Sequence, residues 1–415
     1  MEIVENQLIQ NLRETTRGKD GKSLFDINAS TICYKTGYAN LDYHLGYMVR
    51  VHNLDGEFIE EYPSMGIPAG SWITFIGKPS TGKTTICEQI AANIVRPFKN
   101  GSVIHFDLEH GGNYSRISTV TKLSIPEIYA GKYVLRKEDN TIADIKKTVV
   151  EIYREKKSKP EVYNYDTGRM NEFGQPIIIP CPTVLLIDSI ASLASDLNEN
   201  EKKDREKQEE VGTQTDRMRT TGEISRLVTE SLPYMEAANI IVLAVNHIKL
   251  KAQVGGMPQP ADILYLKQDE SMPGGRAPQY YASILIRVNA LGSEKYTLEE
   301  DGFDGFGAMF DIIKSRVNKA GQKVHMIYDS VNGYEPVRTN LAYSKELGIL
   351  TGNKNKAYFL DNPDVKFSLK NAPDEFKEDK SLYKVMYDAM KPAMNNLLSQ
   401  ASESRLTYVE DEYDY

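Results

Sequence analysis

The chain has 415 residues, and 50 Lys and Arg against 58 Asp and Glu give it a formal net charge of −8. Hydrophobic residues at 40% and charged residues at 26% are typical of a globular protein, which excludes a disordered chain, a collagen-like repeat and a coiled-coil rod. Three cysteines without a C-x-x-C pair give neither a disulfide framework nor a zinc site, and no apolar stretch is long enough to span a membrane. We therefore predict a cytoplasmic protein, and its length predicts two or three domains.

The predicted elements alternate between helix and strand along the chain. After a short polar helix at 1–17, apolar runs predict strands at 72–76, 102–106, 184–187, 240–245, 283–288 and 309–314. Helical spacing of apolar residues marks 84–95 and 142–154. This order predicts an α/β fold with a mostly parallel central sheet that is covered on both faces.

Several stretches do not fit this alternation. Residues 157–180 are rich in Pro and Gly, whereas 196–223 and 249–279 are long and polar, as functional loops often are. From 336 the composition changes, which predicts a small C-terminal domain at 336–401. The end at 402–415 has five acids and one arginine, which favours a solubilising tail or a docking segment.

The sequence GKPSTGKT at 77–84 matches the phosphate-binding pattern G-x-x-x-x-G-K-[ST], and it lies between a predicted strand and a predicted helix. Backbone N–H groups of such a loop surround phosphate oxygens, Lys83 reaches the β- and γ-phosphates, and the Thr84 hydroxyl ligates Mg²⁺. We therefore expect ATP to contact Gly77, Pro79, Ser80, Thr81, Gly82, Lys83, Thr84 and Thr85.

Carboxylates that end predicted strands supply the other half of the site. Asp188 follows the apolar run VLLI, and a buried acid there needs a partner such as the Mg²⁺ ion. Asp107 and Glu109, in FDLEH, follow the strand at 102–106. Ligands bind outside the carboxyl ends of parallel strands, so both are candidates to activate water, and Glu109 lies further out.

The ordered segments TGYANLDYHLG, GKPSTGKTT, FDLEH, VLLIDSIASL, LAVNHIKLK and IIKSRVNKAG resemble the RecA recombinases, and most closely the UvsX-type recombinases of phages. The resemblance covers about 31–350 and implies a RecA-like ATPase core at 31–335, after an N-terminal polymerisation segment at 1–30. It also implies a bacterial host cell as the location, if the chain is phage-encoded.

Residue by residue, the resemblance places Glu109 as the water-activating glutamate and His247 as a sensor of the γ-phosphate. Lys314 and Arg316, in KSR, match basic residues that reach the nucleotide of the neighbouring subunit. RecA-like proteins stack adenine on a tyrosine about seven residues past the glutamate. That position is Arg116 here, and Tyr114 is the aromatic candidate nearby.

The segments 196–223 and 249–279 correspond to the two DNA-binding loops of the family. Their candidate phosphate contacts are Arg217, Arg219, Lys249, Lys251 and Arg276, while Gly274 and Gly275 would permit close approach of a DNA strand. The segments 47–66 and 157–180 look like insertions without an assigned role.

We therefore predict a DNA-dependent ATPase that uses ATP and Mg²⁺, forms a filament on single-stranded DNA and pairs it with homologous duplex. A single-stranded DNA-binding protein and a mediator or loader are expected partners. Two alternatives stay open at this point: a ring-forming RecA-fold helicase, and a regulatory paralogue that binds nucleotide without turnover.

Overall fold

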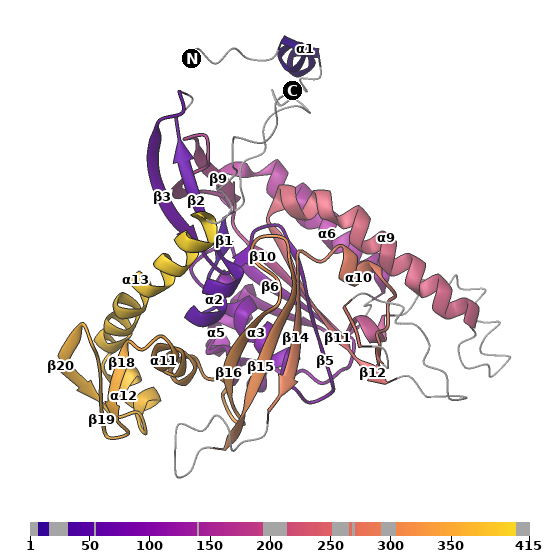
Figure 1. The fold of residues 1–415 in the computed structure, drawn as a ribbon. Helices are drawn as coiled ribbons and strands as arrows, with labels where there is room; N and C mark the ends of the chain where they lie inside the picture. Colours follow the sequence, from indigo (N-terminus) through magenta and orange to yellow (C-terminus); the bar gives the residue numbers. More distant parts are fainter. Residues whose placement is uncertain are drawn as a thin grey trace.

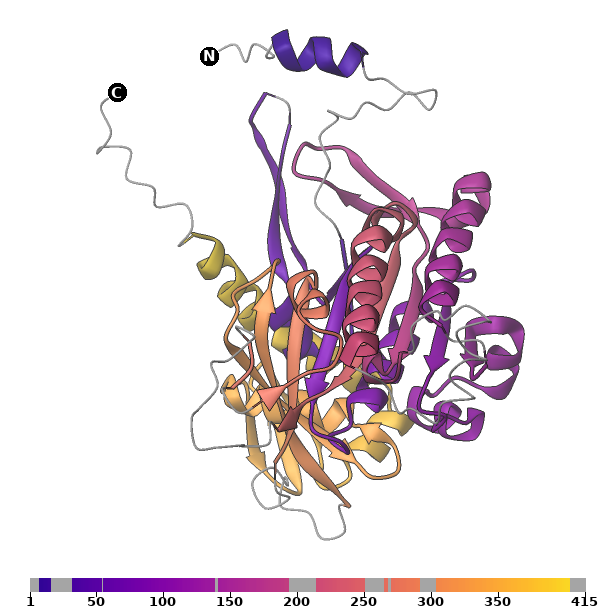
Figure 2. The same cartoon turned by 90° about the vertical axis from the view of Figure 1, so that its right-hand side faces the viewer.

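The structure is a computed structural model that describes residues 7–15, 32–53, 55–138, 141–193, 214–250, 265–267, 270–291 and 304–403 (Figures 1 and 2). Its centre is a nine-stranded sheet. In spatial order the strands are β17 (Gly333–Tyr334), β16 (Gln322–Asp329), β15 (Gly305–Ser315), β14 (Ile284–Ala290), β5 (Trp72–Gly77), β11 (Ile240–His247), β10 (Thr183–Asp188), β6 (Ser102–Asp107) and β7 (Tyr133–Arg136).

The six strands from β14 to β7 are parallel, and β15 to β17 extend the sheet as an antiparallel edge. Strands β5 and β10 are buried along their whole length because helices cover both sides of the sheet, which explains their uninterrupted apolar sequences. The predicted parallel α/β sheet is thus confirmed.

Two helical layers cover the sheet (Figure 1). Helices α2 (Ala39–Leu45) and α3 (Lys83–Val95) pack on one face, while α6 (Ile142–Ser158) and α9 (Gln214–Ala238) pack on the other. The apolar stripe of α6, made of Ile142, Ile145 and Val149, is buried at helical spacing. Helix α9 corrects one expectation, because residues 214–223 are helical rather than part of a loop.

Shorter helices connect these layers. They are α4 (Tyr114–Thr121), α5 (Ile125–Glu127), the π-helical turn η1 (Ile128–Lys132), α7 (Pro160–Tyr163), the 3₁₀ turn η2 (Ile190–Ser192) and α10 (Ala277–Tyr280). Two small antiparallel pairs complete this part: β1 (Cys33–Tyr34) with β4 (Ile67–Pro68), and β12 (Lys249–Leu250) with β13 (Glu270–Ser271).

The two unassigned insertions fold as antiparallel hairpins that contact each other. They are β2 (Tyr47–His52) with β3 (Phe58–Ser64), and β8 (Asn164–Met170) with β9 (Pro176–Pro180). The Tyr62 hydroxyl donates to the Met170 carbonyl at 2.7 Å, and the His52 N–H donates to the Glu172 carbonyl at 3.0 Å. Because β9 leads into the amino end of β10, this double hairpin lies away from the carboxyl edge of the parallel strands.

Residues from 336 onward form a subdomain around an apolar cluster that Ala39 of α2 joins, and Leu341, Phe359 and Phe376 are fully buried in it. Its elements are α11 (Pro336–Glu346), β18 (Leu350–Asn353), β19 (Lys356–Phe359), β20 (Asn362–Phe367), α12 (Ala372–Glu378) and α13 (Ser381–Glu403). At the other end, α1 (Gln7–Thr15) is the described part of the N-terminal segment. Among the described helices, none is both long and apolar enough to cross a membrane.

Candidate nucleotide-binding site

The phosphate-binding loop joins the carboxyl end of β5 to the first turn of α3. Gly82 adopts a positive φ of 80°, and a Cβ atom there would lie 2.8 Å from the Tyr334 hydroxyl oxygen, so glycine is required on both grounds. Ser80 also has a positive φ, of 60°. The loop therefore combines a tight turn with a helix N-terminus, which is a general anion-binding arrangement.

Lys83 is the first residue of α3, and its ammonium group points back into the loop. Its Nζ donates to the Lys78 carbonyl at 2.6 Å. Burial lowers the pKa of Lys83 to about 8, although the nearby Asp188 carboxylate acts in the opposite direction. A bound phosphate would raise this pKa again, because its negative charge would stabilise the charged form of Lys83.

Thr84 and Asp188 meet across the ends of α3 and β10. The Thr84 hydroxyl donates to Oδ2 of Asp188 at 2.8 Å, and burial raises the pKa of Asp188 to about 6. The second oxygen, Oδ1, is buried and has no hydrogen-bond partner among the described residues. A hydroxyl and one spare carboxylate oxygen fit Mg²⁺, which takes few protein ligands beside substrate phosphates. The described residues hold no group of three or more His, Cys, Asp or Glu arranged for a metal.

Glu109 lies beyond the end of β6, and two side chains hold its Oε1 atom. The Ser189 hydroxyl donates to it at 2.6 Å, and Nε2 of His247 lies 2.8 Å away. Burial would raise the pKa of Glu109, but these hydrogen bonds outweigh it and the net pKa is lowered. The side chain is thus a carboxylate at neutral pH, as a general base must be.

Asp107 was the other acid considered for this role, and its geometry is different. Its side chain is buried and accepts hydrogen bonds from the backbone N–H groups of Gly111 and Gly112, at 3.2 and 2.8 Å. The carboxylate therefore shapes the turn after β6. Glu109, which is partly exposed and bonded to His247, is better placed to meet a water molecule.

Residues from distant parts of the sequence surround Gly82. Tyr328 and Tyr334, from β16 and β17, contact Gly82, and Arg116 donates to the Tyr328 hydroxyl at 3.2 Å. Arg116 also donates to the Val331 carbonyl at 2.5 Å. Helix α4 and the turn between β16 and β17 thus flank the phosphate-binding loop.

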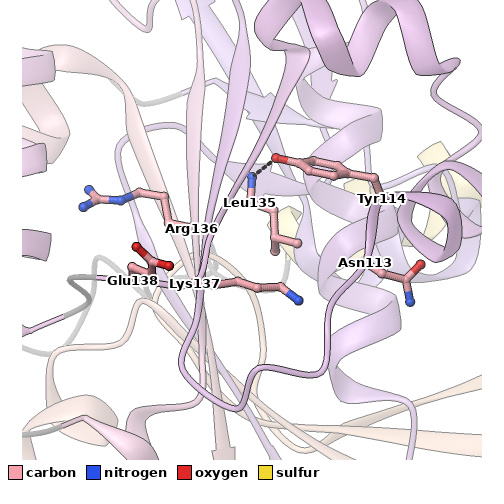
Figure 3. A pocket seen from close by; sticks show the side chains of 6 residues that line it. All are labelled: Asn113, Tyr114, Leu135, Arg136, Lys137 and Glu138. Atoms are coloured by element: carbon pink, nitrogen blue, oxygen red, sulfur yellow. Dashed lines mark hydrogen bonds between the residues drawn. The ribbon is translucent and has the colours of Figure 1, made fainter.

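Tyr114 lies on another side of α4. Its hydroxyl accepts the backbone N–H of Leu135 at 3.2 Å, and the ring lines an open cavity of about 580 Å³ (Figure 3). The lining residues are Asn113, Tyr114, Leu135, Arg136, Lys137 and Glu138. Arg116, rather than Tyr114, is therefore the α4 residue that contacts the neighbours of the phosphate-binding loop.

Lys314 and Arg316 lie far from the phosphate-binding loop of their own chain. Lys314 pairs with Leu285, which pairs with Thr74, and three residue steps along β5 from Thr74 to Gly77 are about 10 Å, with two interstrand spacings of about 4.8 Å across the sheet. Both basic side chains donate to the Tyr280 carbonyl at the end of α10. Burial, with a contribution from Arg316, lowers the pKa of Lys314 to about 8.

The residues proposed to contact DNA are only partly brought together. Lys249 and Arg276 are exposed, whereas Lys251 lies outside the described residues. Arg217 lies in helix α9, as does Arg219, which pairs with Glu223 at 3.1 Å. These two arginines belong to a helix and not to a loop.

Gly274 and Gly275 have an explanation within the protein itself. Both adopt positive φ, and a Cβ atom on Gly275 would lie 2.4 Å from Cγ2 of Thr221 in α9. A Cβ atom on Gly274 would lie 2.9 Å from Cγ2 of Ile190. Backbone conformation and packing therefore account for both glycines without DNA.

Sequence reasoning missed Ser189 and the tyrosines beside Gly82. Ser189 directly follows Asp188, so its position after a strand-ending acid was a usable signal. Tyr328 and Tyr334 lie more than 240 residues from Gly82, and no local pattern links such distant positions.

Several known proteins are similar to this chain in sequence. The family model "ATPase family associated with various cellular activities (AAA)" matches residues 73–251, which contain the phosphate-binding loop, Glu109 and Asp188. Protein RecA of Teredinibacter turnerae is 23% identical over 330 residues, or 79% of each chain. Protein RecA of Clostridium perfringens (strain 13) is 25% identical over 255 residues, or 61% of this chain and 56% of the relative. The "Crystal structure of the RadB recombinase" matches 66% of this chain and 93% of that chain at 16% identity, with a TM-score of 0.38.

Proposed function

We propose that this chain, an ATPase related to the RecA-type recombinases, uses ATP to assemble on single-stranded DNA and to exchange it with homologous duplex. The observation that carries the proposal is that two groups of candidate site residues lie at opposite edges of one sheet. The phosphate-binding loop, Asp188 and Glu109 lie at the carboxyl edge of the parallel strands, and Lys314 lies at the amino edge.

Each group is half of a site in this proposal, and within the first half-site the chain's residues have distinct roles. The loop N–H groups and Lys83 would bind the phosphates, while Thr84 and Asp188 would hold Mg²⁺, which would neutralise phosphate charge. Glu109 orients the attacking water and accepts its proton, and ADP and inorganic phosphate are the products. Ser189 and His247 keep the carboxylate charged and oriented.

The second half-site belongs to the neighbouring subunit in this proposal. Lys314 and Arg316 would stabilise negative charge on the transferring phosphoryl group of an adjacent chain. The lowered pKa of Lys314, due mainly to burial, supports a role in which phosphate replaces carbonyl oxygens as its partner. Hydrolysis would then depend on assembly.

DNA binding rests on the second polar segment and on the relationship to RecA. Lys249 lies two residues after His247, the last residue of β11, and Arg276 directly precedes α10. DNA bound by Lys249 would therefore contact the chain two residues from His247, which contacts Glu109. The closer likeness to UvsX-type recombinases, the filament, a single-stranded DNA-binding protein and a loader remain parts of this proposal.

The test is steady-state ATP hydrolysis with and without single-stranded DNA, at low and moderate salt, for wild type and Lys83→Ala. We expect strong stimulation that falls with salt, since phosphate contacts release counterions, and loss of nucleotide-dependent assembly in the variant. Lys99→Ala, at an exposed lysine beyond α3, is the control and should behave as wild type. Absence of stimulation at either salt would refute DNA-driven function and favour a regulatory paralogue, while closed rings in electron micrographs would favour a helicase.

A further inference from the structure

The second polar segment, residues 249–279, is attached to the central sheet at both of its ends. The entering end follows β11 and the returning end contacts β14, and these two strands flank β5, which leads into the phosphate-binding loop. At the entering end, β11 pairs with β5, and the Ile248 N–H donates to the Gly77 carbonyl at 3.1 Å. At the returning end, Glu270 in β13 bonds to Arg287 in β14, the strand that pairs with β5 on its other side. Residues 251–264 and 268–269, which lie between these two contacts, are outside the described part of the chain.

The returning end is held by a buried, two-pronged ion pair. Nη2 of Arg287 donates to Oε2 of Glu270 at 2.8 Å, and Nη1 donates to Oε1 at 3.3 Å. Both residues are less than a tenth exposed. The same guanidinium donates to the Tyr265 carbonyl, and the same carboxylate accepts the Lys267 N–H. Arg287 thus binds Glu270 and Tyr265 directly, and it holds Lys267 through the carboxylate of Glu270.

Arg287 also has a second carboxylate beside it. In the pairing of β14 with β15 it lies directly opposite Asp311, and directly paired residues point to the same face of a sheet. Oδ2 of Asp311 accepts a hydrogen bond from Asn289, whereas Oδ1 is buried and without a partner among the described residues. Nε of Arg287 is likewise buried and unpaired within the described part. A donor and an acceptor that lack partners among the described residues therefore belong to directly paired residues on the same face of two adjacent strands.

We propose that Arg287 is a positioning residue that couples the second polar segment to the nucleotide site, by bonding either to Glu270 or mainly to Asp311. Bonding to Glu270 fixes the returning end to β14, next to β5 and the phosphate-binding loop. When Arg287 bonds to Asp311 instead, the contact between Glu270 and β14 is lost, and the carboxylate of Asp311 balances the guanidinium charge. The inference rests on the proposed function, because the coupled event is DNA binding by this segment.

The measurement is the affinity for a labelled oligothymidine with ADP and with a non-hydrolysable ATP analogue. In wild type the two dissociation constants should differ about tenfold, a typical coupling between sites. Glu270→Leu combined with Arg287→Met replaces the ion pair by apolar side chains and should fold, since such replacements are often neutral or stabilising. We expect the ratio to fall to about twofold or less, because the apolar contact has no alternative partner.

Asp311→Asn is the variant that separates positioning from simple stabilisation. It leaves the Glu270 pair intact and removes the alternative anionic partner, so the ratio should also fall. A merely structural ion pair would not respond to this change. Glu155→Gln, which breaks an exposed pair with Lys159, is the matched control and should keep the wild-type ratio.

The outcomes separate a wrong assignment of Arg287 from a failure of the proposed function. If wild type shows a nucleotide-dependent affinity that folded Arg287→Met/Glu270→Leu and Asp311→Asn proteins retain, the assignment of Arg287 is wrong and the proposed function stands. If wild type binds no oligothymidine with either nucleotide, the proposed function fails, and the coupling fails with it.

Discussion

Mixing two inactive variants tests whether the catalytic site is shared between subunits. Glu109→Gln removes the base at the carboxyl edge of the sheet, and Lys314→Ala removes a cation at the amino edge, about 10 Å along the strands and two strands away from the same chain's Gly77. Each variant alone should lose ATP hydrolysis by about a thousandfold, the lower end of the effect of a cation supplied in trans. Lys314→Ala should retain nucleotide binding, because it lies far from its own phosphate-binding loop.

The expected recovery of ATP hydrolysis equals the fraction of subunit interfaces that contain a complete site. In a random one-to-one mixture, a working site needs Glu109 from one variant and Lys314 from the other, which occurs at about one quarter of the interfaces of a heterologous assembly. A mixture of Glu109→Gln with Lys319→Ala, at an exposed lysine after β15, is the control. It should recover about one half, because both of its members carry Lys314.

The assay is steady-state hydrolysis with single-stranded DNA at constant total protein, with thermal melts to confirm that each variant is folded. Activity no greater than the sum of the two separate variants, in mixtures shown to co-assemble, would refute the shared site. A Lys314→Ala protein that hydrolyses ATP as wild type does would refute it as well.

Three further predictions concern the site and the subdomain. Ser189→Ala removes a donor that lowers the pKa of Glu109; the acidic limb of the pH–rate profile should move to higher pH with little loss at alkaline pH, and an unmoved limb would contradict this. Asp188→Asn should raise the Mg²⁺ concentration needed for half-maximal hydrolysis about tenfold or more, and an unchanged requirement would exclude Asp188 as a ligand. Phe376→Ala should lower the free energy of unfolding of its subdomain by about 3–5 kcal/mol in urea titrations, since this side chain is fully buried, and a loss below about 1 kcal/mol would refute its place in that core.

The sequence predicted the central sheet well because its signals are local. Continuous apolar runs marked β10 and β11, and the spacing of the phosphate-binding motif located the turn between β5 and α3. Helix α9 was missed at 214–223 because that stretch is polar, and its helical state follows from the packing of later residues such as Ile224 and Leu227. Tertiary packing there outweighed local composition.

The site was predictable where one motif contains its residues and not where distant strands meet. The motif at 77–84 and Asp188 came from local patterns, whereas the contact of Arg116 with Tyr328 joins residues 212 positions apart. The pair of Arg287 with Glu270 was equally hidden, since each looks like an ordinary surface charge in the sequence. Burial, which the sequence does not display, is what makes that pair informative.

The positions of the two half-sites also constrain how subunits can assemble. If the carboxyl edge of one chain meets the amino edge of the next, the two surfaces in contact are different, and the interface is heterologous. Such an interface leaves both free surfaces available after each addition, so growth stops only if the rotation per subunit closes a ring. A twofold dimer, which buries the same surface on both chains, would leave Glu109 and Lys314 in separate places. The proposed shared site is therefore compatible with a filament or a ring, and a stable twofold dimer as the active species would contradict it.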